Sequence, residues 1–417
     1  MQFHFPRSHW RTLLAALAAI SSAQPAQSQT TRDSAGIQIV DNTRATLPAA
    51  RAWRVDPNPI LTIGGQTADT DTLTELALVM GVARLSGGRF AIGVQASHAV
   101  RFYDARGRFV GFAGRKGAGP GEFRQIMGVR AIRGDTLVIT DLGEVEIFSG
   151  EGKFVRQGAS RARGDIFIYP VVVLDDGAYL GVQYNDRSIP PAGRSRRALS
   201  LVRVSRDGAR LDTIGSVLSA EEVFDGRSPF GSRVAFSRGS LFAGNDTRLF
   251  TTSPVLSEIT QLNPAGRTTR VIRLPNRGGK LGDEEIRDYR VWWLAMPGED
   301  GRPMQPAAKA RMAQQLERTV YADRLPAFGD LIVDRPGNLW AQRFDHRSVF
   351  FKPGPASTQT MPVASRWDIL DDAGRWLCTV DLPARFTPVE IGADYVAGVA
   401  RDEDDVEQVR VYRLRKP

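Results

Sequence analysis

The chain has 417 residues, of which 42% are apolar, 24% charged and 8% aromatic, a composition that excludes collagen-like, low-complexity and disordered chains. Its 55 Lys and Arg residues against 46 Asp and Glu residues give a formal net charge of +9, but the basic residues are scattered along the sequence rather than gathered into a nucleic-acid-binding tract. We therefore expect a globular protein that binds no nucleic acid and is long enough for one large repetitive domain.

Residues 1–28 are predicted to be a secretory signal peptide. Arg7 and Arg11 precede the apolar run LLAALAAI at 13–20, and small residues suited to cleavage follow it. This run is too short to cross a bilayer, so the sequence predicts an exported, periplasmic or extracellular protein without a membrane span. The single cysteine, Cys378, excludes an intrachain disulfide and a cysteine-rich metal site.

After an N-terminal extension at 29–58, the sequence repeats a hairpin in which an apolar strand, a turn that usually carries glycine and a second strand follow one another. The second strands are expected at 89–94, 136–141, 178–184, 240–245, 338–343 and 394–399. A further hairpin follows the first five, with turn glycines Gly107, Gly152, Gly208, Gly266 and Gly374. Four-stranded units that recur every 45 residues or more, about the length of a propeller blade, predict an all-β fold, a six-bladed β-propeller.

The two ends of the chain are predicted to share one blade. The sixth unit, at 387–414, contains only three strands, whereas the strand PILTIGG at 59–65 belongs to no unit of its own. Adding this strand to the last unit would remove an exposed sheet edge. We therefore expect residues 59–417 to form a ring closed by the N-terminal strand.

Residues 276–327 are the clearly helical part of the sequence and form a predicted insertion between blades 4 and 5. Asp283 is expected to cap a first helix that ends before Pro297, and a second helix begins at Pro306. We expect the two helices to form a lid or wall over one mouth of the channel. In the alternative interpretation, Trp292 and Trp293 of the first helix simply pack it onto the sheets.

Long connections predict the ligand-binding face. Turns from the first to the second strand of a unit are short. The long insertions are expected in the other connections, which lie at the opposite face: 185–197, 246–257, 276–327 and 344–365. We expect a monomer that binds a protein, peptide or glycan ligand there. The candidate ligand-binding residues are His98, Arg115, Lys116, Tyr184, Arg187, Trp292, Trp293, Arg343 and His346.

Several enzyme classes are not favoured by the motifs. Gly117, Gly119 and Gly121 lead into a strand rather than a helix, which excludes a dinucleotide phosphate loop and favours a tight crossing between blades. After signal removal only His98 and His346 remain, too few for a three-histidine zinc centre. No G-x-S-x-G motif presents a nucleophilic serine.

Oxygen-bearing side chains at the expected upper ends of second strands form a candidate metal site. These residues are Asp141, Asn185, Asn245 and Asp345. Carboxylate and carbonyl oxygens are the ligands that Ca²⁺ prefers, so a calcium ion is the cofactor they could hold. The alternative is that Asp and Asn end these strands because they favour turns.

The segments GRKGAGPGEFRQIMGVRAI (114–132), LPAFGDLIVDRPGNLWAQRF (325–344) and DDAGRWLCTVDLP (371–383) resemble NHL-type repeats of secreted bacterial six-bladed propellers. This resemblance covers residues 59–417 as a pattern and implies the fold rather than an activity. Calcium-dependent sugar-lactone hydrolases are similar propellers, which makes a metal-dependent hydrolase or lyase the alternative function. The favoured function is a non-catalytic exported propeller that binds a ligand.

Overall fold

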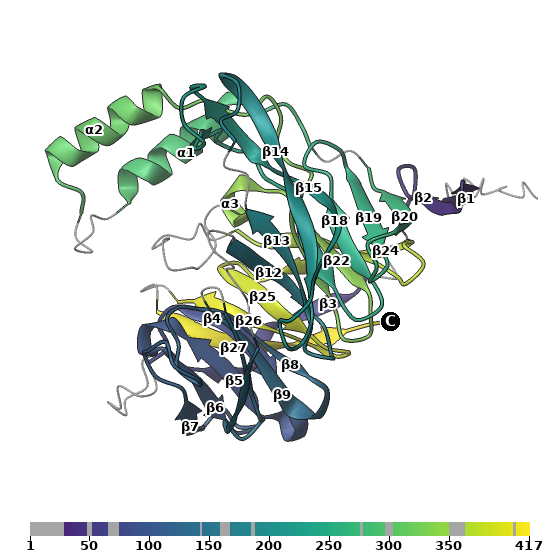
Figure 1. The fold of residues 1–417 in the computed structure, drawn as a ribbon, viewed down its shortest axis with the longest axis vertical. Coiled ribbons are helices and arrows are strands. Elements are labelled where there is room, and N and C mark those ends of the chain that lie inside the picture. The colour runs from purple at the N-terminus through teal and green to yellow at the C-terminus, as the bar shows by residue number, and fades with distance from the viewer. Residues whose placement is uncertain are drawn as a thin grey trace, which may run out of the picture.

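The computed structural model describes residues 29–47, 52–65, 75–141, 144–158, 167–184, 188–275, 278–296, 303–349, 363–402 and 406–417. The predicted signal peptide lies outside these ranges. Strands of the described residues form six sheets, in which neighbouring strands are almost all antiparallel (Figure 1).

The first, second and fifth sheets each contain four strands that follow one another both in space and along the chain. The first sheet comprises β4 (Val79–Arg84), β5 (Phe90–Val94), β6 (Ala99–Tyr103) and β7 (Phe109–Ala113). The second comprises β8 (Ile126–Ile132), β9 (Thr136–Asp141), β10 (Glu144–Phe148) and β11 (Phe154–Gly158). The fifth comprises β21 (Phe328–Val333), β22 (Leu339–Arg343), β23 (Ser365–Leu370) and β24 (Trp376–Leu382).

The third sheet extends beyond this pattern through a long hairpin. It comprises β12 (Phe167–Val173), β13 (Tyr179–Tyr184), β14 (Gly193–Val204), β15 (Leu211–Phe224) and the short β16 (Ser232–Arg233). Strands β14 and β15 pair from Gly193 opposite Phe224 to Val204 opposite Leu211, with two register shifts. The far end of this hairpin reaches toward the helices in Figure 1.

Strand assignment in the fourth sheet differs from the prediction. The sheet contains β17 (Phe242–Gly244), β18 (Leu249–Thr252), β19 (Glu258–Leu262) and β20 (Thr268–Arg273). The segment 240–245 was expected to be a second strand, but it contains the first strand, and its partner is β18. The apolar run at 232–236, expected to be the first strand, instead packs under a helix, because Val234 and Phe236 belong to a cluster with Tyr289.

Residues of the N-terminal extension join the outer edge of the fourth sheet, which the sequence did not predict. Strand β2 (Ile37–Asp41) pairs in parallel with β20 and antiparallel with β1 (Thr30–Ser34). The buried Asn42 side chain then donates a hydrogen bond to the Gly374 carbonyl and accepts one from the Trp376 amide of the fifth sheet. This segment therefore ties two neighbouring sheets together.

The sixth sheet combines both ends of the chain. Strands β25 (Phe386–Ile391), β26 (Tyr395–Arg401) and β27 (Glu407–Arg415) are followed in space by β3 (Arg54–Ile63). Strand β3 pairs antiparallel with β27 from Ile63 opposite Val409 to Arg54 opposite Arg415. The strand predicted at 59–65 lies largely within β3, which begins five residues earlier.

Glycine turns separate the third and fourth strands as predicted. The five turn glycines Gly107, Gly152, Gly208, Gly266 and Gly374 all have a positive φ, between 69° and 83°. Only glycine adopts this conformation without a steric penalty, so it fixes the hairpin geometry. At Gly107 and Gly374, an aspartate three residues earlier also accepts backbone N–H groups of the turn, as Asp104 does from Arg106 and Arg108.

Two helices lie between β20 and β21. Helix α1 spans Asp283–Ala295 with Gly282 as its N-cap, one residue earlier than predicted, and α2 spans Pro306–Glu317. A four-residue helix, α3 (His346–Val349), follows β22. Figure 1 shows α1 and α2 extending outward from the sheets. Among the described helices, none is long and apolar enough to cross a membrane.

Buried apolar clusters join each sheet to the next along the chain. One cluster, for example, contains Phe102 of the first sheet and Leu137 of the second. Another joins Ile63 and Tyr395 of the sixth sheet to Ile92 of the first. Consecutive antiparallel sheets that pack face to face in this way form a β-propeller.

Candidate functional site

A cavity of about 860 Å³ is lined by the first strand of each described sheet. Its apolar wall includes Val82 of β4, Val129 of β8, Val172 of β12, Gly244 of β17, Leu331 of β21 and Val389 of β25. Because the first strands of all sheets meet here, the cavity lies where the central channel of a propeller is found. Its charged lining residues lie near the ends of these strands or in the turns that lead to the second strands.

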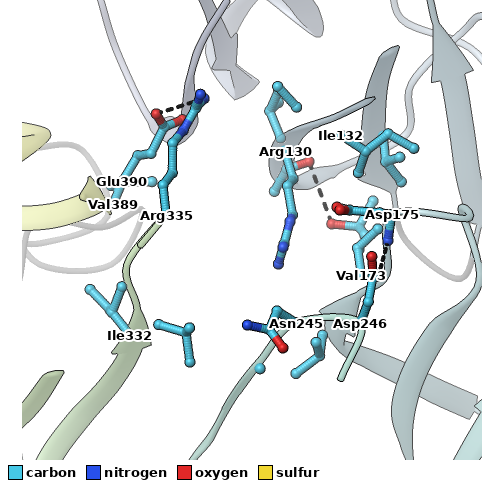
Figure 2. A pocket seen from close by; sticks show the side chains of 18 of the residues that line it. Arg130, Ile132, Val173, Asp175, Asn245, Asp246, Ile332, Arg335, Val389 and Glu390 are labelled. Carbon is cyan, nitrogen blue, oxygen red and sulfur yellow. Dashed lines mark hydrogen bonds and ion pairs between the residues drawn. The ribbon is translucent and has the colours of Figure 1, made fainter. Parts of the chain in front are cut away.

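Arg130 is the central charged group of this cavity. It lies within β8, and Figure 2 shows its side chain extending into the cavity between the walls formed by the other labelled residues. Burial lowers the pKa of its guanidinium, although Asp175, Asp246 and Glu390 oppose this effect. The Arg130 side chain makes no hydrogen bond or ion pair with any residue in the described part of the chain. An arginine remains charged at neutral pH, and because this side chain extends into the cavity, its positive charge faces the cavity.

Asp175 and Asp246 lie together on one wall. Both follow first strands, and the Asp246 carboxylate accepts a hydrogen bond from the Asp175 backbone N–H at 2.5 Å. Burial and the neighbouring Asp246 carboxylate raise the pKa of Asp175, whereas Arg130 and Arg133 lower it. The nearest of these cations is Arg133, whose Nε lies 3.9 Å from an Asp175 oxygen. This wall therefore presents acceptor oxygens.

Asn245 adds a donor next to Arg130. Its Oδ1 accepts hydrogen bonds from the backbone N–H groups of Thr247 and Arg248, both at 3.1 Å, and from the Thr247 hydroxyl at 3.0 Å. These donors fix the amide orientation, because a flipped amide would place an NH₂ group against backbone N–H groups. In Figure 2 the Asn245 nitrogen accordingly faces the cavity below Arg130.

The opposite wall consists of polar groups that satisfy one another. Arg335 forms an ion pair with Glu390 at 2.9 Å and donates to the Arg84 carbonyl at 2.6 Å (Figure 2). Glu390 also accepts hydrogen bonds from the Arg84 amide and the Tyr395 hydroxyl. The Arg84 guanidinium lies 4.3 Å from the centre of the Tyr395 ring. This wall is therefore preorganised without a ligand.

Of the ligand-binding residues predicted from the sequence, none whose side chain is described lines this cavity. Those with described polar contacts bond within the protein. His98 Nδ1 lies 3.2 Å from the Phe123 carbonyl, Arg115 forms an ion pair with Glu122 at 2.8 Å, and Lys116 forms a backbone bridge with Phe123. Glu122 also accepts the Gly119 amide, so the glycine run encloses a carboxylate of its own chain and links β7 to β8.

Two other predicted ligand residues hold the helical insertion and the fifth sheet. His346, which is 7% exposed, lies with Nε2 2.8 Å from Asp288 of α1. Arg343 forms an ion pair with Asp368 at 2.8 Å and donates to the Thr379 hydroxyl at 3.1 Å. In the described part of the chain, these two side chains therefore bond other protein residues.

The tryptophans of α1 lie in an aromatic cluster. Trp292 and Trp293 meet edge to face with ring centres 4.9 Å apart, and Trp293 lies 6.1 Å from Tyr289. Tyr289 in turn contacts Phe236 at 5.3 Å between ring centres. This arrangement agrees with the interpretation that these side chains pack the helix. Arg187 lies outside the described residues, as does the Tyr184 side chain.

The predicted calcium ligands are distributed over two ends of the sheets. Asp141, at the end of β9, accepts backbone N–H groups from Arg124 and Gln125. Asp345 follows β22 and bonds Arg347. Asn245, however, follows the first strand β17 and lies at the other end, because its strand was assigned wrongly. Asn185 lies outside the described residues, and among the described ranges no group of three His, Cys, Asp or Glu could hold a metal ion.

Sequence reasoning missed the main cavity residues, Arg130, Asp175, Arg335 and Glu390. A usable signal was present, since Arg130 interrupts the apolar run of an inner strand, IMGVRAI. A lone charge in a strand that lines a channel must be paired or face the channel. The three others directly follow or end apolar strands, where they resemble ordinary turn residues.

Comparison with known proteins supports the fold alone. No protein-family model matches the chain, and no curated protein sequence matches it. Among solved structures, a member of the DUF4221 family from Bacteroides vulgatus has a TM-score of 0.51 at 9% identity, covering 88% of this chain and 99% of its own. A gluconolactonase from Xanthomonas campestris scores 0.41 at 13% identity, covering 88% and 99%. Regucalcin, a calcium-binding protein from Agrobacterium tumefaciens, scores 0.39 at 10% identity, covering 88% and 97%. The chain is therefore similar in fold to known β-propeller proteins, at identities that carry no function.

Proposed function

We propose that the chain is an exported six-bladed β-propeller with NHL-like repeats, whose ring is closed by β3 and whose fourth and fifth blades flank the 276–327 helical insertion. The pairing of β3 with β27 and the apolar cluster between the sixth and first sheets support closure. Export is supported by the signal-like sequence at 1–28.

Closure predicts different effects for two truncations. Removing residues up to 65 deletes β3 and exposes the edge of β27, so we expect the thermal unfolding midpoint to fall by more than about 15 °C, or folding to fail. Removing residues up to 47 deletes β1, β2 and the Asn42 contacts but keeps β3, so it is the control for the longer truncation and should lower the midpoint clearly less. Equal midpoints for the longer truncation and the full chain would contradict closure.

We propose that this propeller is a non-catalytic binding protein that holds a small ligand in the channel cavity. The observation that carries this proposal is a cavity of about 860 Å³ with an apolar wall and converging polar groups at one end. Small-molecule sites commonly have this size and character. The expectation of a protein, peptide or glycan ligand therefore narrows to a small glycan, a short peptide or a metabolite.

The ligand position also changes from the one expected. The charged cavity residues lie near the ends of first strands and in the short turns that follow them, whereas the ligand was expected on the insertion-bearing face. A metal-dependent hydrolase or lyase is not favoured, because the proposed calcium ligands Asp141 and Asn245 belong to different ends of the sheets.

A cavity-filling variant tests the proposal. Ile332 lines the cavity in Figure 2, so Ile332→Trp should fill part of it, whereas Val110→Trp on the outer strand β7 leaves it open. A panel of monosaccharides, sugar acids, sugar phosphates, amino acids and dipeptides is screened by thermal shift. We expect at least one compound to raise the unfolding midpoint of the wild type and of Val110→Trp, but not of Ile332→Trp.

A second measurement separates binding from catalysis. Compounds that bind are followed by NMR for conversion, and purified protein is analysed for metals. A panel without any binder, or a binder insensitive to Ile332→Trp, would overturn the channel site. Turnover that depends on a stoichiometric divalent ion would favour the hydrolase or lyase instead.

A further inference from the structure

We propose that the channel site recognises an oxyanion, a carboxylate or phosphate group of a small ligand, through the Arg130 guanidinium and the Asn245 side-chain amide. This inference rests on the proposed channel ligand and adds its chemical class. It concerns the end of the cavity shown in Figure 2.

The Arg130 guanidinium is a cation for which the described residues provide no hydrogen-bonded or ion-paired partner. Other arginines of the cavity lining are already engaged: Arg335 with Glu390, and Arg84 with the Tyr395 ring. The Arg130 guanidinium has neither an ion pair nor a hydrogen bond within the described part of the chain, although the side chain extends from a wall strand into the cavity (Figure 2). Taking a guanidinium out of water is costly unless a partner replaces the water, and an oxyanion is the partner it binds bidentately.

Asn245 contributes a second donor from another sheet. Its oxygen is held by the turn that follows β17, through the Thr247 and Arg248 amides. The NH₂ group is thereby turned toward the cavity, below Arg130 in Figure 2. Two donor groups from β8 and from the β17–β18 turn thus converge on one space. Donors without a matching acceptor are what an oxyanion site requires.

The flanking carboxylates specify the rest of the ligand. Asp175 and Asp246 provide acceptors beside the donor pair, suited to a hydroxyl or ammonium group next to the oxyanion. A metal cation is disfavoured at these carboxylates because Arg130 faces the same cavity and Arg133 lies 3.9 Å from Asp175. Apolar residues such as Val173 and Ile332 would contact the ligand body.

The test compares three ligands with one sugar frame: D-glucuronate, glucose 6-phosphate and neutral glucose, each titrated calorimetrically at low salt. We expect at least one of the two anions to bind the wild type ten or more times more tightly than glucose. The preferred anion then distinguishes a carboxylate site from a phosphate site.

Variants locate the effect. Arg130→Gln should weaken binding of the preferred anion at least tenfold, and Asn245→Asp should do so while its oxygen still accepts the turn amides. Arg106→Gln is the matched control, because it removes the same charge from an exposed arginine in the β6–β7 turn, outside the cavity lining, and should change affinity less than threefold. Unfolding midpoints are measured for all variants, so that only folded proteins are compared.

Each outcome decides the proposal. Failure of both anions to bind, or unchanged anion affinity in folded Arg130→Gln, would overturn it. Glucose or another neutral compound that binds as tightly as the anions and is blocked by Ile332→Trp would overturn the oxyanion assignment while leaving the channel function intact. A panel in which nothing binds would overturn both.

Discussion

The two ends of the propeller use polar residues differently. At the insertion-bearing end, polar side chains are engaged within the chain, as in Arg343 with Asp368 and His346 with Asp288. At the short-turn end, Arg130 and the Asn245 amide nitrogen face a cavity. The comparison indicates that long connections need internal bonds to hold them, whereas short turns can present unpaired groups because the strands already position them. Substitutions should therefore affect stability at the first end and binding at the second.

The largest stability effect is expected at the Arg343–Asp368 pair. The Asp368 side chain is 2% exposed, so Arg343→Gln leaves a buried carboxylate without its cation and should lower the free energy of unfolding by about 3 to 5 kcal/mol. Urea denaturation measures this loss. Arg366→Gln is the control on the same sheet, because Arg366 and Asp381 are each 54% exposed and their pair should contribute less than about 1 kcal/mol. Equal losses in the two variants would contradict the assignment.

A pH-dependent effect is expected at Glu146 of β10. This residue is fully buried, and burial raises the pKa of its carboxyl to about 7, with Glu144 and Asp141 contributing in the same direction. Between about pH 4.5 and 7 the unfolded chain is ionised while the folded protein keeps its proton, so stability falls as pH rises through this window. The loss of stability should be about 3 to 4 kcal/mol over this window and stay constant at higher pH.

Glu146→Gln checks this prediction. The amide cannot ionise, so the variant should lack this part of the pH dependence and be more stable than the wild type at pH 8 in urea denaturation. Glu151→Gln, on a side chain that is 74% exposed, should leave the pH profile unchanged. If the free energy of unfolding had the same pH dependence between pH 5 and 7 in the wild type and in Glu146→Gln, the assignment would be contradicted.

Features set by local sequence could be predicted, whereas features set by tertiary contacts could not. Turn glycines such as Gly107 and Gly374 require a positive φ, a local property, so the hairpins could be predicted from them. In the fourth sheet the apolar run at 232–236 resembled a strand better than the three-residue β17 did, but its burial comes from Tyr289 of α1, which only the tertiary structure brings there. Because of that error, Asn245 was predicted at the insertion-bearing end, whereas it lies at the short-turn end. Arg130 was missed because only the tertiary structure shows that the described residues around its guanidinium leave it without an ion pair.

A smaller effect is expected at Asp141, which is 1% exposed. Asp141→Ala removes the acceptor of the Arg124 and Gln125 amides and should cost about 1 to 3 kcal/mol. Asp141→Asn keeps one acceptor oxygen and should lose less. Metal content of purified protein is expected to be the same in both variants and the wild type. Loss of a bound divalent ion in Asp141→Ala would instead support the calcium alternative.

The smallest stability effect is expected at Arg130, and it sharpens the comparison most. Arg130 and Arg343 are both partly buried arginines on sheet strands, but among the described residues only Arg343 of these two has an ion-paired carboxylate. Removing a desolvated charge without a partner relieves a cost rather than breaking a bond, so Arg130→Gln should change the free energy of unfolding by less than about 1 kcal/mol, or increase it. Urea denaturation of Arg130→Gln and Arg343→Gln, each against the wild type, compares the two changes in the free energy of unfolding. A loss of about 3 kcal/mol or more in Arg130→Gln would mean that this guanidinium is a structural group like Arg343, and the distinction between the two ends would fail.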